Sequence, residues 1–291
     1  MKKQLAEAPD VPSPRTLPWS AHNKKEISTW RSCHQKLLDD ARQFRPSASN
    51  RKPRLVLFGD SITESWRGTS YGRPVPRTNG VPDVLSSTLA ERFDAPLPLG
   101  IAADCTQHLL WRLHAGELSQ SMRTDPHLHM VLLIGTNNLG KGHTPQEAIR
   151  GIVACAQLLL NATRGRLLVN AILPRGDSRK RGARRKGAGQ GFLGDVAAVN
   201  RALVNGTARE LIQRVSPDRV HFADCGADFL APGVLMPNDE SRKTAGEPWQ
   251  ELVRRDLMQD RLHPNKDGHR LWAACMLRAF DQVRWPTRAE S

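Results

Sequence analysis

Five short apolar runs alternate with helical patterns along most of this chain. The runs are nearly continuous, as is typical of strands that are buried on both faces of a parallel sheet. They cover residues 55–59, 96–101, 129–135, 166–173 and 219–225. Apolar residues at helical spacing lie around and between them, at 22–44, 81–93, 106–118, 144–163, 195–215 and 265–283. This order predicts one doubly wound α/β sheet with mostly parallel strands.

The chain has 291 residues, which is enough for one large domain or two small ones, and the regular alternation favours one. We assign this domain to residues 53–285 and expect a basic flexible insertion at 174–195. An N-terminal helix and linker at 22–52 precede the domain. Disordered tails are expected at 1–21, which is rich in proline and polar residues, and at 286–291.

The formal net charge is +14, and much of the excess lies in one stretch. Residues 175–186 carry seven basic side chains and one acid, which first suggests a solvated loop. The alternatives are contact of 175–187 with an anionic glycan or lipid surface, and nucleic-acid contact or nuclear import. Only Phe192 is aromatic nearby, so we expect no base-stacking platform and no specific nucleic-acid partner.

The five cysteines are dispersed, with no CxxC motif and no nearby cluster of cysteine and histidine. This pattern argues against a disulfide framework and a structural zinc site, and it favours a reducing compartment. The first residues lack the apolar run of a secretory signal, and no stretch is apolar for long enough to span a membrane. We therefore expect a cytoplasmic or other intracellular location.

Polar residues follow the first three strand candidates. Ser61 follows the first, residues 102–104 follow the second, and residues 136–138 follow the third. Functional residues of doubly wound sheets collect just beyond the carboxyl ends of the strands. The three segments should therefore meet in space. Taken alone, Ser61 fits a helix cap as well as a nucleophile.

A nucleophilic serine needs an imidazole to take its proton and a carboxylate to orient that imidazole. The stretch DRLHPNKDGH, at 260–269, offers Asp260 and His263 three residues apart, just before the last helix. The alternative is a capping turn for that helix, with Asn265 or Asp267 near the cap. The pair His127 and His129 has no third ligand nearby, so its metal-binding signal is weak.

Asn137 lies in the stretch LLIGTNNLG, where a strand ends on Gly-Thr-Asn-Asn. A plain turn explains an asparagine there, because asparagine tolerates irregular backbone. A side-chain N–H that points into a site would instead stabilise a developing oxyanion.

Four stretches, FGDSITESW, GIAADCTQHLLWRL, LLIGTNNLG and DRLHP, occur in this order and resemble the conserved blocks of the SGNH (GDSL-type) hydrolases. The branch of the platelet-activating-factor acetylhydrolase Ib catalytic subunits is the most similar, over roughly residues 53–283. The resemblance implies a flavodoxin-like five-stranded parallel sheet with helices on both faces, and ester hydrolysis through an acyl-serine without a cofactor or metal.

The resemblance also implies a role for each matching residue. Ser61 would be the nucleophile, His263 the general base and then acid, and Asp260 the group that orients it. The oxyanion would be held by the backbone N–H groups of Ser61 and Ala103 and by the Asn137 side chain. Three neighbours within these blocks are expected to support the site: Asp60, Gly100 and Asp104.

The second block departs from the branch at one position that matters. The branch usually reads Gly-Ile-Gly-Gly-Asp, whereas this chain has Ala102 and Ala103 in place of the two later glycines. The backbone N–H survives this change. If the family glycine uses positive φ, Ala103 would be strained by about 1 kcal/mol or more. The two methyl groups are also expected to narrow the acyl pocket and to favour acetyl over longer chains.

These observations predict a serine esterase that acts on acetyl or other short-chain esters, with a carbohydrate or lipid O-deacetylase as one form. The substrate would be a small-molecule ester or an ester on a glycan or lipid, and a homodimer is left open. The alternative is a catalytically impaired SGNH module that binds acetylated ligands or polyanions. A nucleic-acid-associated protein that uses its +14 charge is a further alternative.

Overall fold

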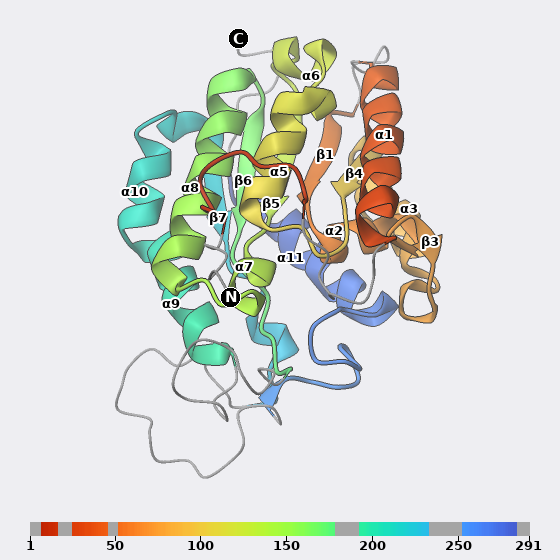
Figure 1. Cartoon of the computed structure of the whole chain (residues 1–291), viewed down its shortest axis with the longest axis vertical. Coiled ribbons are helices and arrows are strands. Elements are labelled where there is room, and N and C mark those ends of the chain that lie inside the picture. The colour runs from red at the N-terminus through yellow and green to blue at the C-terminus, as the bar shows by residue number, and fades with distance from the viewer. Residues whose placement is uncertain (1–6, 17–24, 46–51, 178–191, 233–251, 284–291) are drawn as a thin grey trace.

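A parallel five-stranded sheet in the order β4-β1-β5-β6-β7 forms the centre of the computed structural model (Figure 1). The structure describes residues 7–16, 25–45, 52–177, 192–232 and 252–283. The strands are β1 (Arg54–Gly59), β4 (Asp94–Gly100), β5 (His129–Leu133), β6 (Arg166–Asn170) and β7 (Val220–Ala223). A separate two-stranded ribbon contains β2 (Thr69–Ser70) and β3 (Arg73–Pro74). The sheet order is that of flavodoxin-like folds, so the predicted fold class is confirmed.

Helices cover both faces of the sheet because successive strand residues point to opposite sides. In β1, Val56 and Phe58 join one core cluster, and Leu55 and Leu57 join the other. The first cluster lies under α1 (Glu26–Gln43), α5 (Thr106–Arg112), α8 (Pro145–Ala162), α9 (Leu193–Asn205) and α10 (Thr207–Gln213). The second lies under α3 (Val81–Ser87), α4 (Leu89–Arg92) and α11 (Lys266–Gln282). Shorter helices are α2 (Ser61–Glu64), α6 (Gln120–Thr124) and α7 (Thr136–Gly140).

Three of the predicted helices are interrupted. Thr88 separates α3 from α4, and its hydroxyl donates to the carbonyl oxygen of Val84 at 2.6 Å, a bond that competes with regular helix geometry. Gly206 separates α9 from α10 with extended backbone, consistent with the poor helix propensity of glycine. The pattern at 106–118 ends in a π-helical turn at Leu113–Glu117. The helix expected at 144–163 is α8, and Thr144 forms a capping box at its start.

The N-terminal segment 7–16 does not behave as the disordered tail that the composition predicted. It crosses over α5 and α8 and is drawn in red in Figure 1. The Thr106 hydroxyl donates to the Pro9 carbonyl oxygen at 2.6 Å, and Arg15 is only 1% exposed. Gly151 on α8 makes room for the crossing, because a Cβ there would lie 2.6 Å from the same carbonyl oxygen. These contacts are remote in sequence, so composition gave no sign of them.

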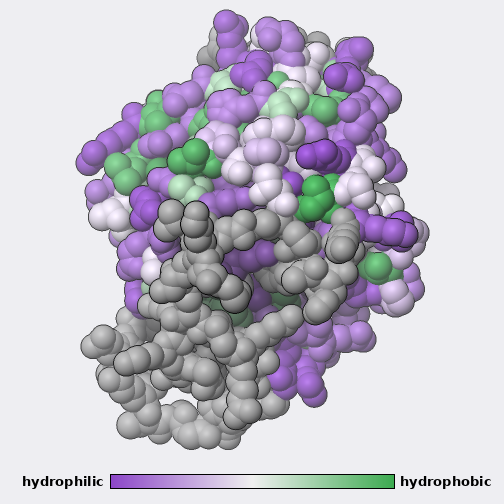
Figure 2. All heavy atoms as spheres, viewed as in Figure 1, coloured by the Kyte–Doolittle hydropathy of each residue, from purple (hydrophilic) through white to green (hydrophobic). Residues whose placement is uncertain are grey.

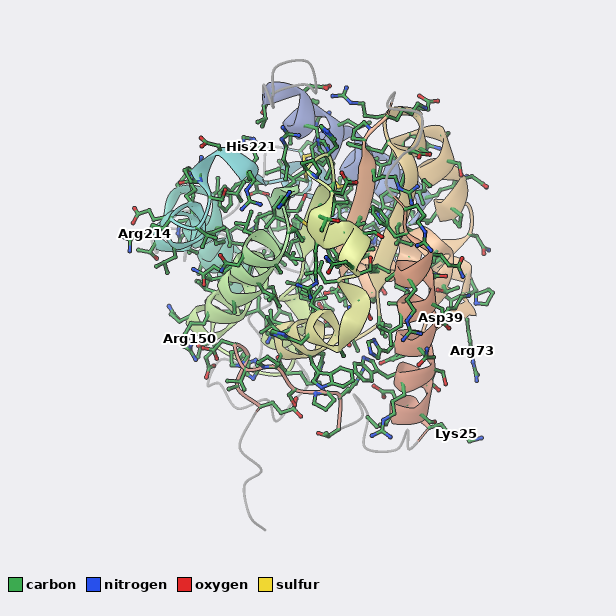
Figure 3. The ribbon with its side chains drawn as sticks, turned by 90° about the horizontal axis from the view of Figure 1, so that it is seen from above. Lys25, Asp39, Arg73, Arg150, Arg214 and His221 are labelled. Atoms are coloured by element: carbon green, nitrogen blue, oxygen red, sulfur yellow. A yellow bond between two sulfur atoms is a disulfide. The ribbon has the colours of Figure 1, made fainter. Side chains whose placement is uncertain are left out.

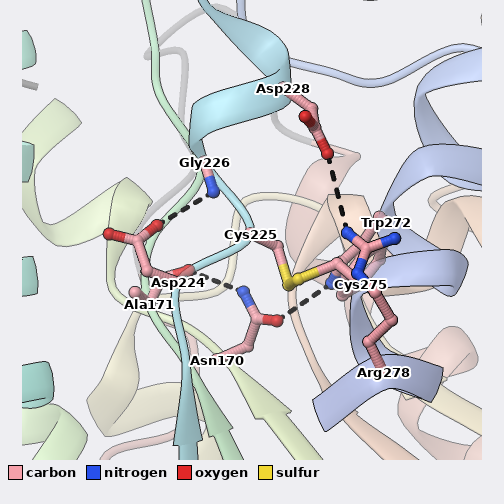
Figure 4. The surroundings of a disulfide bond; sticks show 9 residues. All are labelled: Asn170, Ala171, Asp224, Cys225, Gly226, Asp228, Trp272, Cys275 and Arg278. Carbon is pink, nitrogen blue, oxygen red and sulfur yellow. Dashed lines mark hydrogen bonds and ion pairs between the residues drawn. A yellow bond between two sulfur atoms is a disulfide. The ribbon is translucent and has the colours of Figure 1, made fainter. Parts of the chain in front are cut away.

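A disulfide joins Cys225, just after β7, to Cys275 in α11 (Figure 4). This corrects the prediction of reduced cysteines. The two residues are 50 positions apart, and only the fold brings their Cα atoms to 5.7 Å. Disulfides persist in oxidising compartments. The intracellular location therefore loses its cysteine argument and stays a prediction.

No helix within the described ranges is both long and apolar enough to cross a bilayer. The coloured part of the face in Figure 2 is mostly hydrophilic, and its apolar side chains are scattered rather than gathered into one patch.

Replacing Cys275 by serine should lower the free energy of unfolding by about 2–4 kcal/mol, because a 50-residue loop of the unfolded chain is no longer closed. Urea unfolding without reductant measures this. Cys33→Ser is the matched control, since the Cys33 thiol is free and partly exposed. If dithiothreitol destabilised Cys275→Ser as much as it destabilised the wild type, the assignment would be wrong.

Candidate active site

The turn that carries Ser61 lies directly after the central strand β1. Asp60 caps α2, and its carboxylate accepts a hydrogen bond from the Ile62 N–H at 3.0 Å. Ser61 is the first residue of the helix, so the cap is Asp60 rather than the serine. Ser61 is 5% exposed, and its main-chain position is fixed by the strand before it and the helix after it.

Two glycines allow this turn to lie against the sheet. A Cβ on Gly100 would come within 2.5 Å of the Asp60 carbonyl oxygen and of the Glu64 nitrogen. A Cβ on Gly59 would come 2.2 Å from the Thr63 hydroxyl oxygen. Larger residues at these two positions would push α2 away from the strand ends. The predicted supporting position of Gly100 thus has a steric reason.

The structure brings Ser61, His263 and Asp260 into one hydrogen-bonded line. The Ser61 Oγ lies 2.9 Å from His263 Nε2, and His263 Nδ1 lies 2.6 Å from Asp260 Oδ2. Asp260 Oδ1 also accepts from the backbone N–H groups of Leu262 and His263, at 3.0 and 2.8 Å. These contacts fix the carboxylate and aim the imidazole at the serine.

The charge of Asp260 follows from this geometry. Partial burial acts to raise its pKa, but the hydrogen bonds from His263 and the Leu262 N–H outweigh burial and lower the pKa to about 2. The carboxylate is therefore ionised at neutral pH and accepts from Nδ1–H. This tautomer leaves the Nε2 lone pair directed at Ser61 Oγ.

The loop at 260–269 is a capping turn as well. Asn265 caps α11, and its side-chain oxygen accepts from the N–H groups of Asp267 and Gly268. His269 in this helix is fully buried, and burial lowers its pKa to about 4. It contacts the Ile62 carbonyl oxygen through Nε2 at 3.3 Å. A neutral His269 thus ties α11 to the helix that carries Ser61.

Asn137 and Ala103 approach the serine turn from the two neighbouring strands. Asn137 is 4% exposed, and its Nδ2 donates to the Asp104 carbonyl oxygen at 2.9 Å. This bond uses one of its two amide hydrogens. Ala103 has φ of 63°, in the left-handed region. Within the described part of the chain, the Ala103 N–H has no hydrogen-bond acceptor.

A buried charge network lies beneath these loops. Asp104 accepts from Trp30 Nε1 and from Arg112 Nε, both at 2.7 Å. Arg112 also pairs with Glu117 and donates to the Gly59 carbonyl oxygen at 2.9 Å. The predicted supporting role of Asp104 therefore has a specific partner, the fully buried Arg112.

Asp60, the third supporting residue, is fully buried, and it forms no ion pair with the residues that the structure describes. Desolvation raises the pKa of Asp60 to about 7. Its Oδ1 accepts from Ile62, whereas its Oδ2 has no partner within the described ranges. Its visible role is that of a helix cap.

Glu64 is a site residue that our sequence reasoning missed. It is 2% exposed, and its Oε2 accepts from the Ala102 N–H at 2.7 Å. Its Oε1 accepts from the Gly72 N–H at 2.7 Å and from the Thr69 hydroxyl at 2.9 Å. Its place three residues after the serine, inside the first block, was the available signal.

Arg175, the first residue of the basic stretch, is not solvated, so the prediction of a solvated loop is wrong at this position. It is 2% exposed, stacks on the Phe192 ring and forms a two-pronged ion pair with Asp177. Its Nη1 donates to the Thr136 carbonyl oxygen at 2.7 Å, next to Asn137. Most of the basic stretch, 178–191, lies outside the described residues.

The histidine pair 127 and 129 lies at the amino end of β5, away from the serine turn. Burial lowers the pKa of His129 to about 4, and its ring packs against Phe93 and Phe280. Over the ranges that the structure covers, no group of three or more metal-ligating side chains gathers.

Comparison with known proteins agrees with the order of the blocks. The chain is 29% identical to the platelet-activating factor acetylhydrolase IB subunit alpha1 of Bos taurus over 165 residues, which is 56% of this chain and 59% of that protein. It is 27% identical to the alpha2 subunit of Rattus norvegicus over 166 residues, which is 57% of this chain and 60% of the relative. The match thus spans about three fifths of these curated relatives.

Two solved structures share the fold. A candidate acylhydrolase from Bacteroides fragilis superposes with a TM-score of 0.54 at 15% identity, covering 85% of this chain and 95% of that one. A candidate platelet activating factor of Streptococcus pneumoniae superposes with a TM-score of 0.52 at 18% identity, covering 89% and 98%.

The family match covers most of the chain. The sequence pattern of the GDSL-like Lipase/Acylhydrolase family fits residues 57–271, from β1 into α11. This match includes all four blocks and agrees with the parallel sheet, which confirms the resemblance found in the sequence. The chain belongs to the GDSL-like lipase/acylhydrolase family of hydrolases.

Proposed function

We propose that this acylhydrolase is a serine esterase that cleaves acetyl or other short-chain carboxylic esters through an acyl-serine intermediate. The observation that carries the proposal is the line of hydrogen bonds from Ser61 Oγ through His263 to Asp260, at 2.9 and 2.6 Å. Ser61 follows β1 at the topological switch point between β1 and β5, where doubly wound sheets bind their ligands.

The proposed reaction uses the serine, the imidazole and one water. Ser61 Oγ attacks the ester carbonyl carbon while His263 Nε2 takes its proton. The tetrahedral intermediate collapses by breaking the bond to the alcohol oxygen, which leaves with that proton. A water then gives a proton to Nε2 and attacks the acyl carbon. The bond from that carbon to Ser61 Oγ breaks, Oγ takes the proton back from Nε2, and the carboxylic acid is released. Asp260, held ionised, stabilises the imidazolium that forms twice.

Three donors would stabilise the oxyanion: the N–H groups of Ser61 and Ala103 and the second amide hydrogen of Asn137. Asn137 is oriented by its bond to the Asp104 carbonyl oxygen. The positive φ of Ala103 is the conformation that the glycine of the family block would adopt without strain. An alanine pays for it with about 1 kcal/mol, and its N–H remains available.

The substrate proposal rests on the second block and on the names of the relatives. The curated relatives are called acetylhydrolases. Ala102 and Ala103 add two methyl groups to the loop that follows β4, the strand next to β1 and Ser61. We therefore propose a small acyl pocket and, as the substrate class, acetyl esters of a carbohydrate or lipid alcohol.

Ser61→Ala should abolish hydrolysis of p-nitrophenyl acetate with unchanged thermal stability. Asp260→Asn should lose less kcat than His263→Ala, because the carboxylate orients and stabilises whereas the imidazole moves the proton. Labelling with a fluorophosphonate probe distinguishes the catalytically impaired binding module, which would leave Ser61 unlabelled. Full activity of Ser61→Ala would refute the proposed mechanism.

Ala103→Gly should raise the free energy of unfolding by up to about 1 kcal/mol, since relief of the positive φ exceeds the entropy cost of glycine. Ala102→Gly is the matched control, because its φ is not positive and only the entropy cost and a lost methyl contact apply. It should lower stability. An equal decrease in the free energy of unfolding of both variants would show that the backbone of Ala103 is not strained.

The acyl pocket is tested with p-nitrophenyl esters of increasing chain length. The kcat/KM should be highest for acetate and should fall steadily towards octanoate, because longer chains meet the methyl groups of the second block. The Ala102→Gly, Ala103→Gly double variant should shift this preference towards longer chains. A wild-type maximum at octanoate would contradict the pocket proposal.

A further inference from the structure

Arg15 is a buried cation in the N-terminal segment, outside the part of the chain that matches the family. Its guanidinium pairs with Glu26 at the start of α1 and lies over the Tyr71 ring, 5.5 Å from the centroid. Tyr71 in turn donates from its hydroxyl to Glu26 at 2.8 Å. The guanidinium is thus held in place before any substrate binds.

Arg15 also forms a hydrogen bond with the second block. Arg15 Nη1 donates to the carbonyl oxygen of Ala102 at 3.0 Å. That oxygen and the N–H of Ala103 belong to the same peptide unit, which is planar and trans. In such a unit the C=O and N–H bonds point in opposite directions. Holding the oxygen of Ala102 therefore sets the direction of the Ala103 N–H.

The same loop is held on its other side. Glu64 accepts a hydrogen bond from the Ala102 N–H at 2.7 Å, so both peptide units that flank Ala102 have a buried partner. Ala103 itself has φ of 63°, a conformation that persists only when its surroundings impose it. Arg15 and Glu64 each hold one of the two peptide units that flank Ala102.

A cation on a carbonyl oxygen also strengthens the donor at the other end of the amide. It draws electron density towards the oxygen and makes the N–H more positive, as in chains of hydrogen bonds that polarise one another. Arg15 is 1% exposed, so water screens this effect little. Both effects act on a donor that stabilises negative charge in the transition state.

We propose that Arg15 is a positioning residue for the oxyanion hole: it orients and polarises the Ala102–Ala103 peptide so that the Ala103 N–H faces the developing oxyanion. This inference rests on the proposed function. It assigns to the N-terminal segment a part in catalysis. The contact of that segment with the family domain would then orient an oxyanion donor.

The test compares Arg15→Met with Arg150→Met in the full chain. Methionine keeps much of the length of arginine and removes the donor. Arg150 is the matched control, because it also ties the N-terminal segment, through an exposed ion pair with Asp10 at 3.4 Å. Figure 3 labels Arg150 at the edge of the molecule. For p-nitrophenyl acetate, Arg15→Met should lose about 10- to 100-fold in kcat with KM within about threefold, less than complete loss of an oxyanion donor. Arg150→Met should match the wild type.

A transition-state analogue separates positioning from general damage. An alkylboronic acid forms a tetrahedral adduct on Ser61 and places an oxygen in the oxyanion hole. Its inhibition constant should rise in Arg15→Met by the same factor by which kcat/KM falls. Added guanidinium ion, at concentrations that do not denature, should restore part of kcat in Arg15→Ala and none in Asn137→Ala.

Ser61→Ala, measured alongside, tells failure of this inference from failure of the proposed function. If Ser61→Ala is inactive while Arg15→Met keeps wild-type kcat or wild-type boronate affinity, the role of Arg15 is refuted and the esterase proposal stands. If Arg15→Met does not fold, Arg15→Gln decides. Glutamine keeps a polar side chain but removes the cation and is shorter than arginine, so wild-type kcat and boronate affinity there overturn the inference.

Discussion

The geometry of the site depends on the hydrogen bonds and ion pairs that the buried guanidinium of Arg112 forms. A fully buried cation must be matched by buried partners, and Arg112 finds them in Asp104, Glu117 and the Gly59 carbonyl oxygen. Gly59 ends the strand that leads to the serine, and Asp104 ends the loop that carries Ala103. One side chain therefore fixes the position of the turn that carries Ser61 relative to the loop that carries Ala103.

The other parts of the site extend from this centre. Asn137 is oriented by the carbonyl oxygen of Asp104, and Arg175 holds the carbonyl oxygen beside Asn137. The backbone N–H of Gly176 then donates to the Arg261 carbonyl oxygen at 2.8 Å, next to the carboxylate that orients the imidazole. Four loops from different strands are thus joined by bonds that each involve a buried polar group, as preorganised active sites require.

The sheet was predictable from the sequence because it depends on local patterns. The serine–imidazole–carboxylate line was predicted because four short blocks resemble a known family, whereas the local patterns alone also allowed helix caps. Continuous apolar runs predict buried parallel strands, and the motif residues follow those runs in order. The packed N-terminal segment, the disulfide and buried Arg175 were not predictable. Each depends on a partner that is remote in sequence. A proline-rich segment, dispersed cysteines or a basic run looks the same in the sequence whether its side chains are packed in the fold or exposed to solvent. The helix breaks at Thr88 and Gly206 were also not predicted, because the helical spacing of apolar residues continues across both positions.

The cross-link between Cys225 and Cys275 has a topological consequence for Asp260 and His263. Asp260 and His263 both lie in the stretch of chain between the two cysteines, so they belong to a covalently closed ring. One end of that ring is fixed next to β7 and the other within α11. A single cut in the backbone between the cysteines would open the ring and still leave both halves attached to the sheet. The segment that carries Asp260 and His263 would thus stay attached after one proteolytic cut.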